Sequence, residues 1–383
     1  MSIVTLQILT NKDCNLRCKY CYEQEKARGK NDIDAIRRYI TALLEERFVK
    51  PESPHEEIVN ETVLLEPIGG ETLMYPDLLD AMCEHVVAEA DRLQIQNPPR
   101  ISISTNGTLL DREDVRDFIR KWGRFLDFGI SIDGTKETHD ANRVDAVGRG
   151  SYDRAVAGYR WLREHVCPRR ISAKATFNHA TVSGYADGVI NLIGLGFTDI
   201  AANVVFEEIW SMEEDYSLLE AQMVRVADYL LEHELVDRVH VHQINPPQFD
   251  LGNFRIPHYR EANHCGSCSH MRCLGYDGIV YGCHRFATMD DPLPIGHLDA
   301  GKGVVITNQP LIDAVVDLHN HWPDECRTCG IGQFCASCAA IPWEVCRDDP
   351  KAFLGRKGYC AFTTACMTAR LYLKECLMER EKA

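Results

Sequence analysis

The order of apolar and polar positions along the chain predicts an alternation of short buried strands and amphipathic helices. Apolar runs that predict strands lie at residues 3–9, 63–68, 101–105, 126–132, 171–177 and 199–206. Apolar side chains recur with helical spacing at residues 31–48, 77–95, 112–122, 153–165, 185–194 and 216–233. Asn31 or Asp32 can cap the first of these helices. Six strand–helix units of this length favour a partial, open (β/α)6 barrel of the TIM-like type.

Three cysteines stand in the loop that should leave the first strand. Cys14, Cys18 and Cys21 have C-x3-C-x2-C spacing, and Tyr20 precedes the last of them. Three thiolates this close can converge on one metal centre, but they cannot fill four coordination positions. The site therefore needs a distant fourth ligand or keeps a position open. A three-cysteine zinc site with a distant histidine and chance burial of the thiols are the alternatives.

Polar motifs also follow the next three predicted strands. They are Gly69-Gly70-Glu71 after the second strand, Asn106 after the third, and Ser131 and Asp133 after the fourth. Glycines at such a point let the backbone approach a ligand closely, although a simple turn is the alternative, and Asp133 could equally shape its own turn. Because parallel α/β barrels build active sites at the carboxyl ends of their strands, we expect these motifs to share one site with the cysteine loop.

Composition narrows the class of protein. The chain has 383 residues, enough for two domains, and its net charge of −15 argues against a nucleic-acid surface. It opens on no signal segment, and no apolar run approaches the ~18 residues that a membrane helix needs. Seventeen cysteines in such a chain indicate metal or redox chemistry in a reducing compartment, so we expect a cytoplasmic protein.

Twelve of the cysteines fall in the last third of the chain. Residues 276–281 predict a strand, an Asp-Gly turn and a second strand, and residues 363–379 predict a terminal helix. The cysteines around and after the hairpin are Cys265, Cys268, Cys273, Cys283, Cys326, Cys329, Cys335, Cys338, Cys346, Cys360, Cys366 and Cys376. Cys-x2-Cys pairs also bind zinc. The organisation we expect is a barrel at 1–206, a bridging region at 207–263 and a small cysteine-rich domain with a hairpin and helices at 264–383.

Together these motifs resemble radical S-adenosylmethionine (SAM) enzymes that carry a C-terminal SPASM domain. The resemblance implies that Cys14, Cys18 and Cys21 hold a [4Fe-4S] cluster whose open iron binds SAM. The sequence ETHDANRVDAVGRGSYDRA is similar to a loop of the peptide-modifying branch, in which Arg143 would clamp the SAM carboxylate, although a surface arginine is the alternative. One departure is Thr72, where the family's GGE motif usually continues with proline. The implied SAM-binding residues are Tyr20, Gly69, Gly70, Glu71, Asn106, Ser131, Asp133 and Arg143.

The resemblance also implies two auxiliary [4Fe-4S] clusters in the cysteine-rich domain. By position, the first would be held by Cys265, Cys268, Cys283 and Cys338. The second would be held by Cys326, Cys329, Cys335 and Cys360, with Cys273 and Cys346 in reserve. Two residues instead of three separate Cys335 from Cys338, and this departure could change one ligand.

The activity that the resemblance implies is reductive cleavage of SAM to a 5′-deoxyadenosyl radical. The radical would take a side-chain hydrogen from a ribosomally made precursor peptide, and an intramolecular thioether, C–C or ether crosslink would form. An anaerobic sulfatase maturase that oxidises a cysteine or serine is the alternative; that branch carries an aspartate base where this chain has His284. A non-enzymatic alternative is an iron–sulfur or zinc-binding adaptor.

The partners that follow are a precursor peptide and an external electron donor such as a flavodoxin or ferredoxin. The chain starts almost directly on the first predicted strand, which leaves no room before it for a peptide-recognition domain. We therefore expect that a separate protein presents the peptide, or that the barrel and bridge grip it directly. Neither a nucleic acid nor a membrane is expected as a partner.

Overall fold

A computed structural model describes residues 3–23, 26–49, 62–245, 265–317, 326, 328–331, 335, 338–350 and 359–382. The predicted loop at 49–61 and the connection after Asn245 lie almost wholly outside the described residues, as do parts of the region around Cys326 to Cys338. Among the described residues, no helix is long and apolar enough to cross a membrane.

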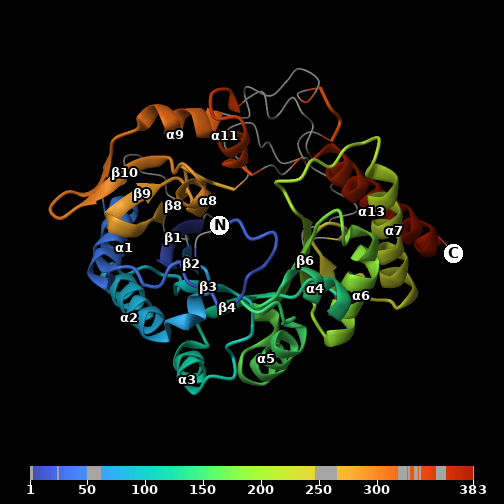
Figure 1. The fold of residues 1–383 in the computed structure, drawn as a ribbon, viewed down its shortest axis with the longest axis horizontal. Coiled ribbons are helices and arrows are strands. Elements are labelled where there is room, and N and C mark those ends of the chain that lie inside the picture. Colours follow the sequence, from blue (N-terminus) through green and yellow to red (C-terminus); the bar gives the residue numbers. More distant parts are fainter. Residues whose placement is uncertain are drawn as a thin grey trace.

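The core of the fold is a curved sheet of parallel strands that pair in chain order (Figure 1). They are β1 (Ile3–Asn11), β2 (Thr62–Gly69), β3 (Arg100–Thr105), β4 (Leu126–Ser131), β5 (Ile171–Phe177), β6 (Asp199–Val204) and the short β7 (His240–Val241). This arrangement confirms the α/β partial barrel. The barrel is open, because β7 ends the sheet on one side and does not pair with the strand at the other end.

Helices connect successive strands and form an arc outside the sheet (Figure 1). They are α1 (Ile33–Phe48), α2 (Pro76–Arg92), α3 (Glu113–Trp122), α5 (Tyr152–His165), α6 (Tyr185–Leu195) and α7 (Tyr216–Glu232). Asp32 caps α1 as expected, since its carboxylate accepts from Asp34 N and Ala35 N. The sequence did not reveal the short helix α4 (Lys136–Asn142), which begins after Thr135 caps it.

Alternating burial along the strands separates an apolar outer face from a polar barrel interior. In β5, Ala173 and Ala175 are buried, whereas Lys174 between them is exposed. β2 and β3 alternate in the same way, with Glu66 and Ser104 at the more open positions. Because successive side chains of a strand point to opposite faces and the helices cover the outer face, the open positions line the interior.

The cysteine-rich region continues the same sheet beyond β1. Its first strand, β8 (Met271–Leu274), pairs with β1 in parallel, and β9 (Ile279–Tyr281), β10 (Pro294–Asp299) and β11 (Gly303–Ile306) follow in antiparallel order. The predicted hairpin is present, but its first strand lies earlier than expected. Tyr276 belongs to the turn, where Asp277 adopts a left-handed conformation with φ of 57°.

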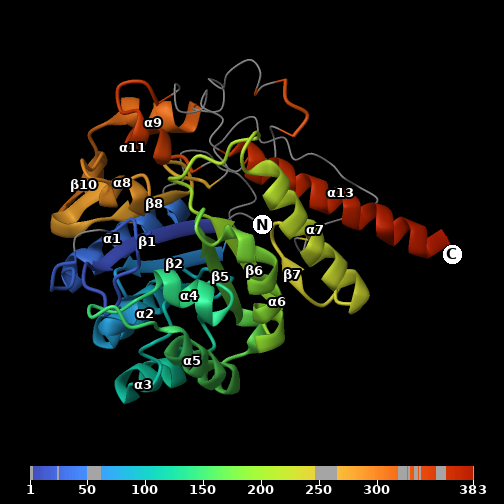
Figure 2. The ribbon, with the colours of Figure 1, turned by 45° about the vertical axis from the view of Figure 1, so that its right-hand side comes forward.

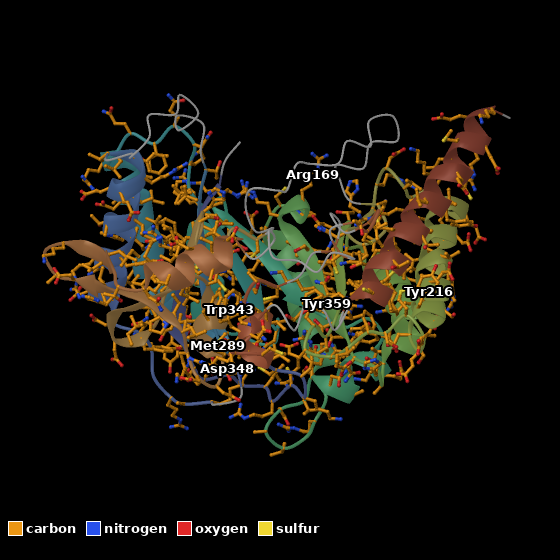
Figure 3. All side chains as sticks on the ribbon, turned by 90° about the horizontal axis from the view of Figure 1, so that it is seen from above. Arg169, Tyr216, Met289, Trp343, Asp348 and Tyr359 are labelled. Atoms are coloured by element: carbon orange, nitrogen blue, oxygen red, sulfur yellow. The ribbon has the colours of Figure 1, made fainter. Side chains whose placement is uncertain are left out.

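The remaining helices fasten the cysteine-rich region to the barrel. They are α8 (His284–Thr288), α9 (Gln309–Val316), α11 (Ile341–Val345) and α13 (Cys360–Lys382). α13, longer than expected, lies along α7 (Figure 2), where the Tyr372 hydroxyl bonds the Asp228 carboxylate at 2.5 Å. Trp343 of α11 packs edge-on against Phe286 with ring centroids 5.9 Å apart, and Tyr359 packs against Phe206 at 5.5 Å (Figure 3).

Candidate active site

The loop after β1 holds the three spaced cysteines at the carboxyl end of the barrel. Leu16, between Cys14 and Cys18, is fully buried and anchors the loop. The backbone N–H groups of Arg17 and Lys19 donate to the carbonyls of Val144 (2.6 Å) and Asn142 (3.0 Å). The loop is thus pinned against the chain that follows α4, and all three sulfurs stay partly accessible.

Hydrogen-bond donors reach two of these sulfurs. Leu16 N donates to Cys14 Sγ at 3.4 Å and Lys26 Nζ donates to Cys21 Sγ at 3.2 Å. Burial raises the pKa of Cys14 to about 12 and also raises the pKa of Cys18. Such thiols stay protonated unless a metal takes the place of the proton, and the neighbouring donors then suit the bound thiolates. The loop therefore fits a thiolate-ligated iron–sulfur cluster.

Gly69 and Gly70 make the close approach expected of them, but to the chain itself. An added Cβ on Gly69 would lie 2.6 Å from the Asn11 carbonyl oxygen, and one on Gly70 would clash with the carbonyl group of Asp13. Gly70 N donates to Asn11 O at 2.9 Å, and Glu71 N donates to Asp13 O at 3.0 Å. The absence of side chains lets β2 run flush against the start of the cysteine loop.

Glu71 ties the end of β2 to the end of β3. Its buried carboxylate accepts hydrogen bonds from Leu73 N (3.2 Å), Thr105 Oγ1 (2.7 Å) and Asn106 N (2.8 Å). Burial raises the pKa of Glu71, and these donors act against the shift. Glu71 therefore positions the backbone on which Asn106 stands.

Asn106 in turn contacts the cysteine loop. Its Nδ2 donates to Asn15 Oδ1 at 2.9 Å and approaches Cys14 Sγ at 3.9 Å, while its Oδ1 accepts from Thr108. Ser131 ends β4 at the same end of the barrel, with its side chain half-buried. Both residues thus lie where the sequence analysis predicted.

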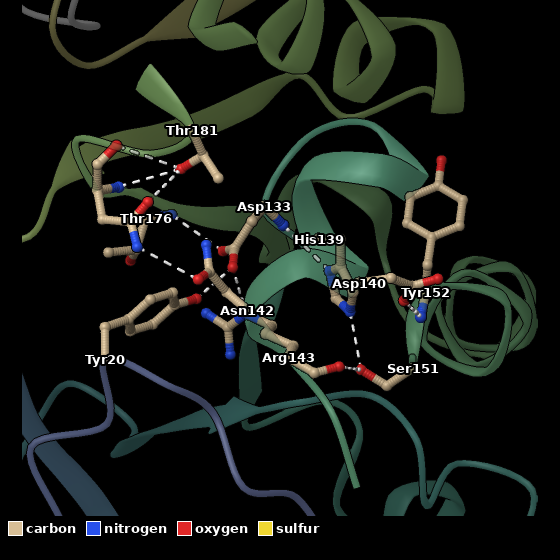
Figure 4. Close-up of polar contacts among 11 residues, drawn as sticks. Tyr20, Asp133, His139, Asp140, Asn142, Arg143, Ser151, Tyr152, Thr176 and Thr181 are labelled. Atoms are coloured by element: carbon tan, nitrogen blue, oxygen red, sulfur yellow. Dashed lines mark hydrogen bonds and ion pairs between the residues drawn. The ribbon is translucent and has the colours of Figure 1, made fainter. Parts of the chain in front are cut away.

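A buried ion pair joins the cysteine loop to the end of β4 (Figure 4). Asp133 Oδ2 accepts from Arg143 Nε at 2.8 Å and from the Tyr20 hydroxyl, and Asp133 Oδ1 accepts from Thr176 N at 3.0 Å. The Arg143 guanidinium also lies 5.4 Å from the centre of the Tyr20 ring. The carboxylate of Asp133 is therefore occupied by protein donors. It holds Arg143 next to the cysteine loop and fixes Tyr20 within that loop.

His139 and Ser151 form hydrogen bonds to the backbone of the two ion-paired residues, and neither was predicted from the sequence. Asp133 N donates to His139 Nδ1 at 3.2 Å, and His139 Nε2 lies 2.9 Å from Ser151 Oγ, which donates to Arg143 O at 2.8 Å (Figure 4). These partners require the proton on Nε2. Burial lowers the pKa of His139 to about 4, so the ring is neutral at physiological pH.

His284 lies beside the barrel interior, next to Cys283 at the end of the hairpin. Its backbone N–H donates to Gln7 Oε1 at 2.9 Å, its Nδ1 lies 3.3 Å from the same oxygen, and its ring centroid is 5.6 Å from that of Tyr22. Burial lowers the pKa of His284 to about 3, which keeps the imidazole neutral but makes it a weak base. Gln7, a polar residue inside an apolar strand, was the signal that the sequence analysis overlooked.

Four of the predicted auxiliary ligands lie near one another. Burial raises the pKa of Cys283 to about 12, with further contributions from Cys338 and Cys265, and the pKa of Cys268 rises to about 11 in part through Cys265. An added Cβ on Gly282 would clash with Cys268 Sγ. These mutual influences place Cys265, Cys268, Cys283 and Cys338 in the same region of the structure.

All four residues of the second predicted set are described, although parts of the chain between them are not. Cys326 and Cys329 both contribute to the raised pKa of Cys335, whose sulfur accepts from Thr363 Oγ1 at 3.6 Å, and Cys360 begins α13. Of the reserves, Cys273 is buried on β8 and Cys346 lies near Cys335 and Cys338. Within the described residues, no three histidine, cysteine, aspartate or glutamate side chains converge closely enough to hold a single metal ion.

Comparisons with known proteins agree with this geometry. Residues 8–185 match the family described as the Radical SAM superfamily. The chain is 25% identical over 349 residues to the serine-type anaerobic sulfatase-maturating enzyme of Klebsiella pneumoniae. The aligned region covers 84% of this chain and 78% of that protein. Just under half of the chain thus matches the radical SAM superfamily, and the comparisons support an enzyme with SAM and iron–sulfur clusters as its cofactors.

Solved structures show the same fold. The structure of native anSMEcpe with bound AdoMet and Kp18Cys peptide matches with a TM-score of 0.68 at 16% identity, over 97% of this chain and 99% of that one. Streptococcus suis SuiB bound to precursor peptide SuiA matches with a TM-score of 0.55 at 13% identity, over 91% and 74%. This chain therefore shares its fold with both proteins over most of its length.

Proposed function

We propose that this radical SAM enzyme modifies a side chain of a ribosomally made peptide and that its leading product is an intramolecular crosslink. The observation that carries the proposal is the open, polar barrel interior, which meets the cysteine loop at one end and His284 at its rim. Such a space can admit a peptide side chain, whereas a closed barrel fills its interior with packed side chains. Both anSMEcpe and SuiB bind a peptide in the solved structures, Kp18Cys and the precursor SuiA respectively.

Each group of residues has a role in this proposal. Cys14, Cys18 and Cys21 hold the cluster, and Arg143 with the strand ends at Glu71, Asn106 and Ser131 orients SAM. When bound, SAM and the cluster supply a radical that removes a hydrogen atom from an unactivated carbon. The chain positions the substrate carbon and excludes water, and His284, although a weak base, is the residue that we assign to take the proton released from the oxidised side chain.

We assign two auxiliary clusters to the cysteine-rich region at 264–383, with the barrel at 1–206 and a bridge at 207–263. The first cluster takes Cys265, Cys268, Cys283 and Cys338, and the second takes Cys326, Cys329, Cys335 and Cys360. Clusters held by these cysteines would supply a route by which the substrate electron could leave to an external acceptor. A flavodoxin or ferredoxin in the cytoplasm would supply the first electron. Iron and sulfide analysis should give about three [4Fe-4S] clusters; about one would contradict this assignment.

The experiment is co-expression with short peptides encoded beside the gene, followed by mass spectrometry. A crosslink appears as the loss of two hydrogen atoms together with missing fragmentation between the joined residues. The same peptide should stay unmodified with a Cys14→Ala variant. Formation of 5′-deoxyadenosine without modification of any peptide or protein substrate would contradict the proposal.

A second candidate is oxidation of a serine or cysteine side chain to an aldehyde. The similarity to the sulfatase-maturating enzyme along most of both chains favours it. His284, where the resemblance places an aspartate, argues against it. Oxidation of serine to an aldehyde also removes two hydrogen atoms, but only the aldehyde reacts with a hydrazide probe. A hydrazide adduct on the product peptide would therefore support this second function and contradict the crosslink.

A further inference from the structure

Lys174 crosses the inner surface of the barrel. It stands on β5 at a position that faces the interior, and its side chain runs over Gly129 of the neighbouring β4. An added Cβ on Gly129 would lie 2.5 Å from Lys174 Cε and 3.1 Å from Lys174 Nζ. Because Gly129 has no side chain, the Lys174 side chain can cross β4 and reach the next strand, β3.

The ammonium group ends at Ser104, on β3. Lys174 Nζ donates to Ser104 Oγ at 2.7 Å. In the sheet, Ser104 is paired with Gly129, and Lys174 is paired with Ser131, two residues nearer the carboxyl end of β4. The charge is therefore held deeper in the barrel than the strand-end site, at a fixed place on the inner wall.

This charge is incompletely compensated. Within the described parts of the chain, no carboxylate lies within the 4.0 Å of an ion pair with Lys174, and Ser104 takes one of its three N–H donors. Burial lowers the pKa of Lys174, and the more distant charge of Glu66 offsets the shift only in part. The Glu66 carboxylate is itself bonded to Gln7 Nε2 at 3.0 Å.

The ammonium and His284 face the same space. Gln7 pairs with Glu66 across β1 and β2, and Ser104, the partner of Lys174, lies on the next strand β3, so both groups border the same interior. Gln7 links the two sides, because it contacts His284 with its oxygen and Glu66 with its nitrogen. A side chain that reaches into the interior next to His284 therefore comes near the spare donors of Lys174.

We propose that Lys174 and Ser104 form a subsite for a carboxylate of the peptide substrate, supplied by an acidic side chain or by the C-terminus. The ammonium offers two further N–H donors, and the serine hydroxyl can donate once it has accepted from the lysine. A carboxylate would supply the counter-charge that Lys174 lacks. This inference rests on the proposed peptide-modifying function and names the substrate chemistry of its interior site.

The test uses short fluorescein-labelled peptides with a central serine or cysteine, bound to the anaerobically reconstituted enzyme with SAM but without reductant. Glutamate or glutamine is placed at each position in turn, and a parallel set compares a free C-terminus with an amide. One placement of the carboxylate should bind about tenfold tighter than its neutral partner, as fits one charge-assisted hydrogen-bonded contact. The responding set tells which source of carboxylate the site takes.

Three variants and one control test whether the preference for a carboxylate arises at Lys174 and Ser104. Lys174→Met should abolish it and leave the affinity for the neutral peptide within about twofold, and Ser104→Ala should weaken it. Gly129→Ala should also weaken it, because the lysine keeps its charge but loses its passage. Lys121→Met removes an exposed lysine on α3, outside the barrel, and should change nothing. A preference that survives Lys174→Met, or peptides that bind without any preference, would overturn the proposal.

A second measurement separates this inference from the proposed function. Crystals of the wild type and of Lys174→Met are soaked in sodium bromide, and anomalous scattering locates the anions. We expect a bromide within hydrogen-bond distance of Lys174 Nζ and Ser104 Oγ in the wild type alone. If no peptide binds but this bromide is present, the peptide function fails and the anion site stands. If the bromide is absent there while peptides bind, the subsite is rejected.

Discussion

The two cysteine sites of this enzyme are built in different ways. The loop with Cys14, Cys18 and Cys21 is tied by backbone hydrogen bonds to the chain after α4, and a buried ion pair braces it through Tyr20. Around Cys283, burial raises the pKa of the thiol and Cys338 adds to that shift, as burial and Cys18 do for Cys14. The difference lies in the support: the first site is braced by the loop hydrogen bonds and the ion pair, whereas the second should depend more on a bound cluster to hold its thiolates together.

The largest effect should come from Cys14→Ser, which removes a cluster ligand without touching the hydrogen bonds of the loop backbone. We expect 5′-deoxyadenosine formation to fall by about a thousandfold or more, with the thermal midpoint nearly unchanged. Product chromatography and calorimetry measure the two. Cys283→Ser should do the reverse, lowering the thermal midpoint of the loaded enzyme while SAM cleavage persists. Equal loss of stability in both variants would show that the two sites do not differ.

Removal of Asp133 should break the brace of the first site. Asp133→Ala leaves Arg143 buried without its counter-charge, so we expect the free energy of unfolding to fall by about 3–5 kcal/mol. Urea denaturation with and without SAM measures this loss. The matched control is Asp153→Ala, which removes an ion pair between two largely exposed side chains, Asp153 and Lys136, and should cost about 1 kcal/mol or less.

Acid should loosen the same brace through His139. Its pKa is about 4 in the folded protein against 6.5 for a free histidine, so the unfolded chain binds the extra proton first. The stabilising contribution is complete above pH 6.5 and is lost between pH 6.5 and 4, by about 3 kcal/mol in all. Urea midpoints measured across this window should fall less steeply in His139→Gln. An identical slope in both proteins would contradict this cause.

The smallest effect should separate the sites most sharply. Gly70→Ala meets the backbone of Asp13, which cannot move away, so it should cost about 1–3 kcal/mol with or without iron. Gly282→Ala meets side chains only, chiefly that of Cys268 and less closely that of Ser267, and both can rotate in the apoprotein. Its cost should therefore be seen only in the cluster-loaded protein. Chemical denaturation of the apo and loaded forms of both variants makes the comparison.

Much of this structure follows from local patterns. The strands of the barrel and its long helices came from periodicity, and the cysteine loop with Glu71, Asn106 and Arg143 came from motifs at strand ends. The role of Asp133 was not predictable, because its partners Tyr20 and Thr176 are distant in sequence and meet only in the folded barrel. In the sequence, Lys174 stands at what looks like an ordinary polar position of a strand. Its reach across the barrel interior depends on Gly129 of another strand, which the sequence does not place beside it.

The parallel pairing of β8 with β1 has a consequence for assembly during synthesis. Thr5 pairs with Met271, so one edge of the first strand stays uncovered until most of the chain has left the ribosome. The opposite edge can pair with β2 much earlier. Until the hairpin arrives, the exposed edge can recruit strands from other chains. The rate of productive folding should therefore be set by this one late closure, and a chaperone that shields β1 should raise the yield.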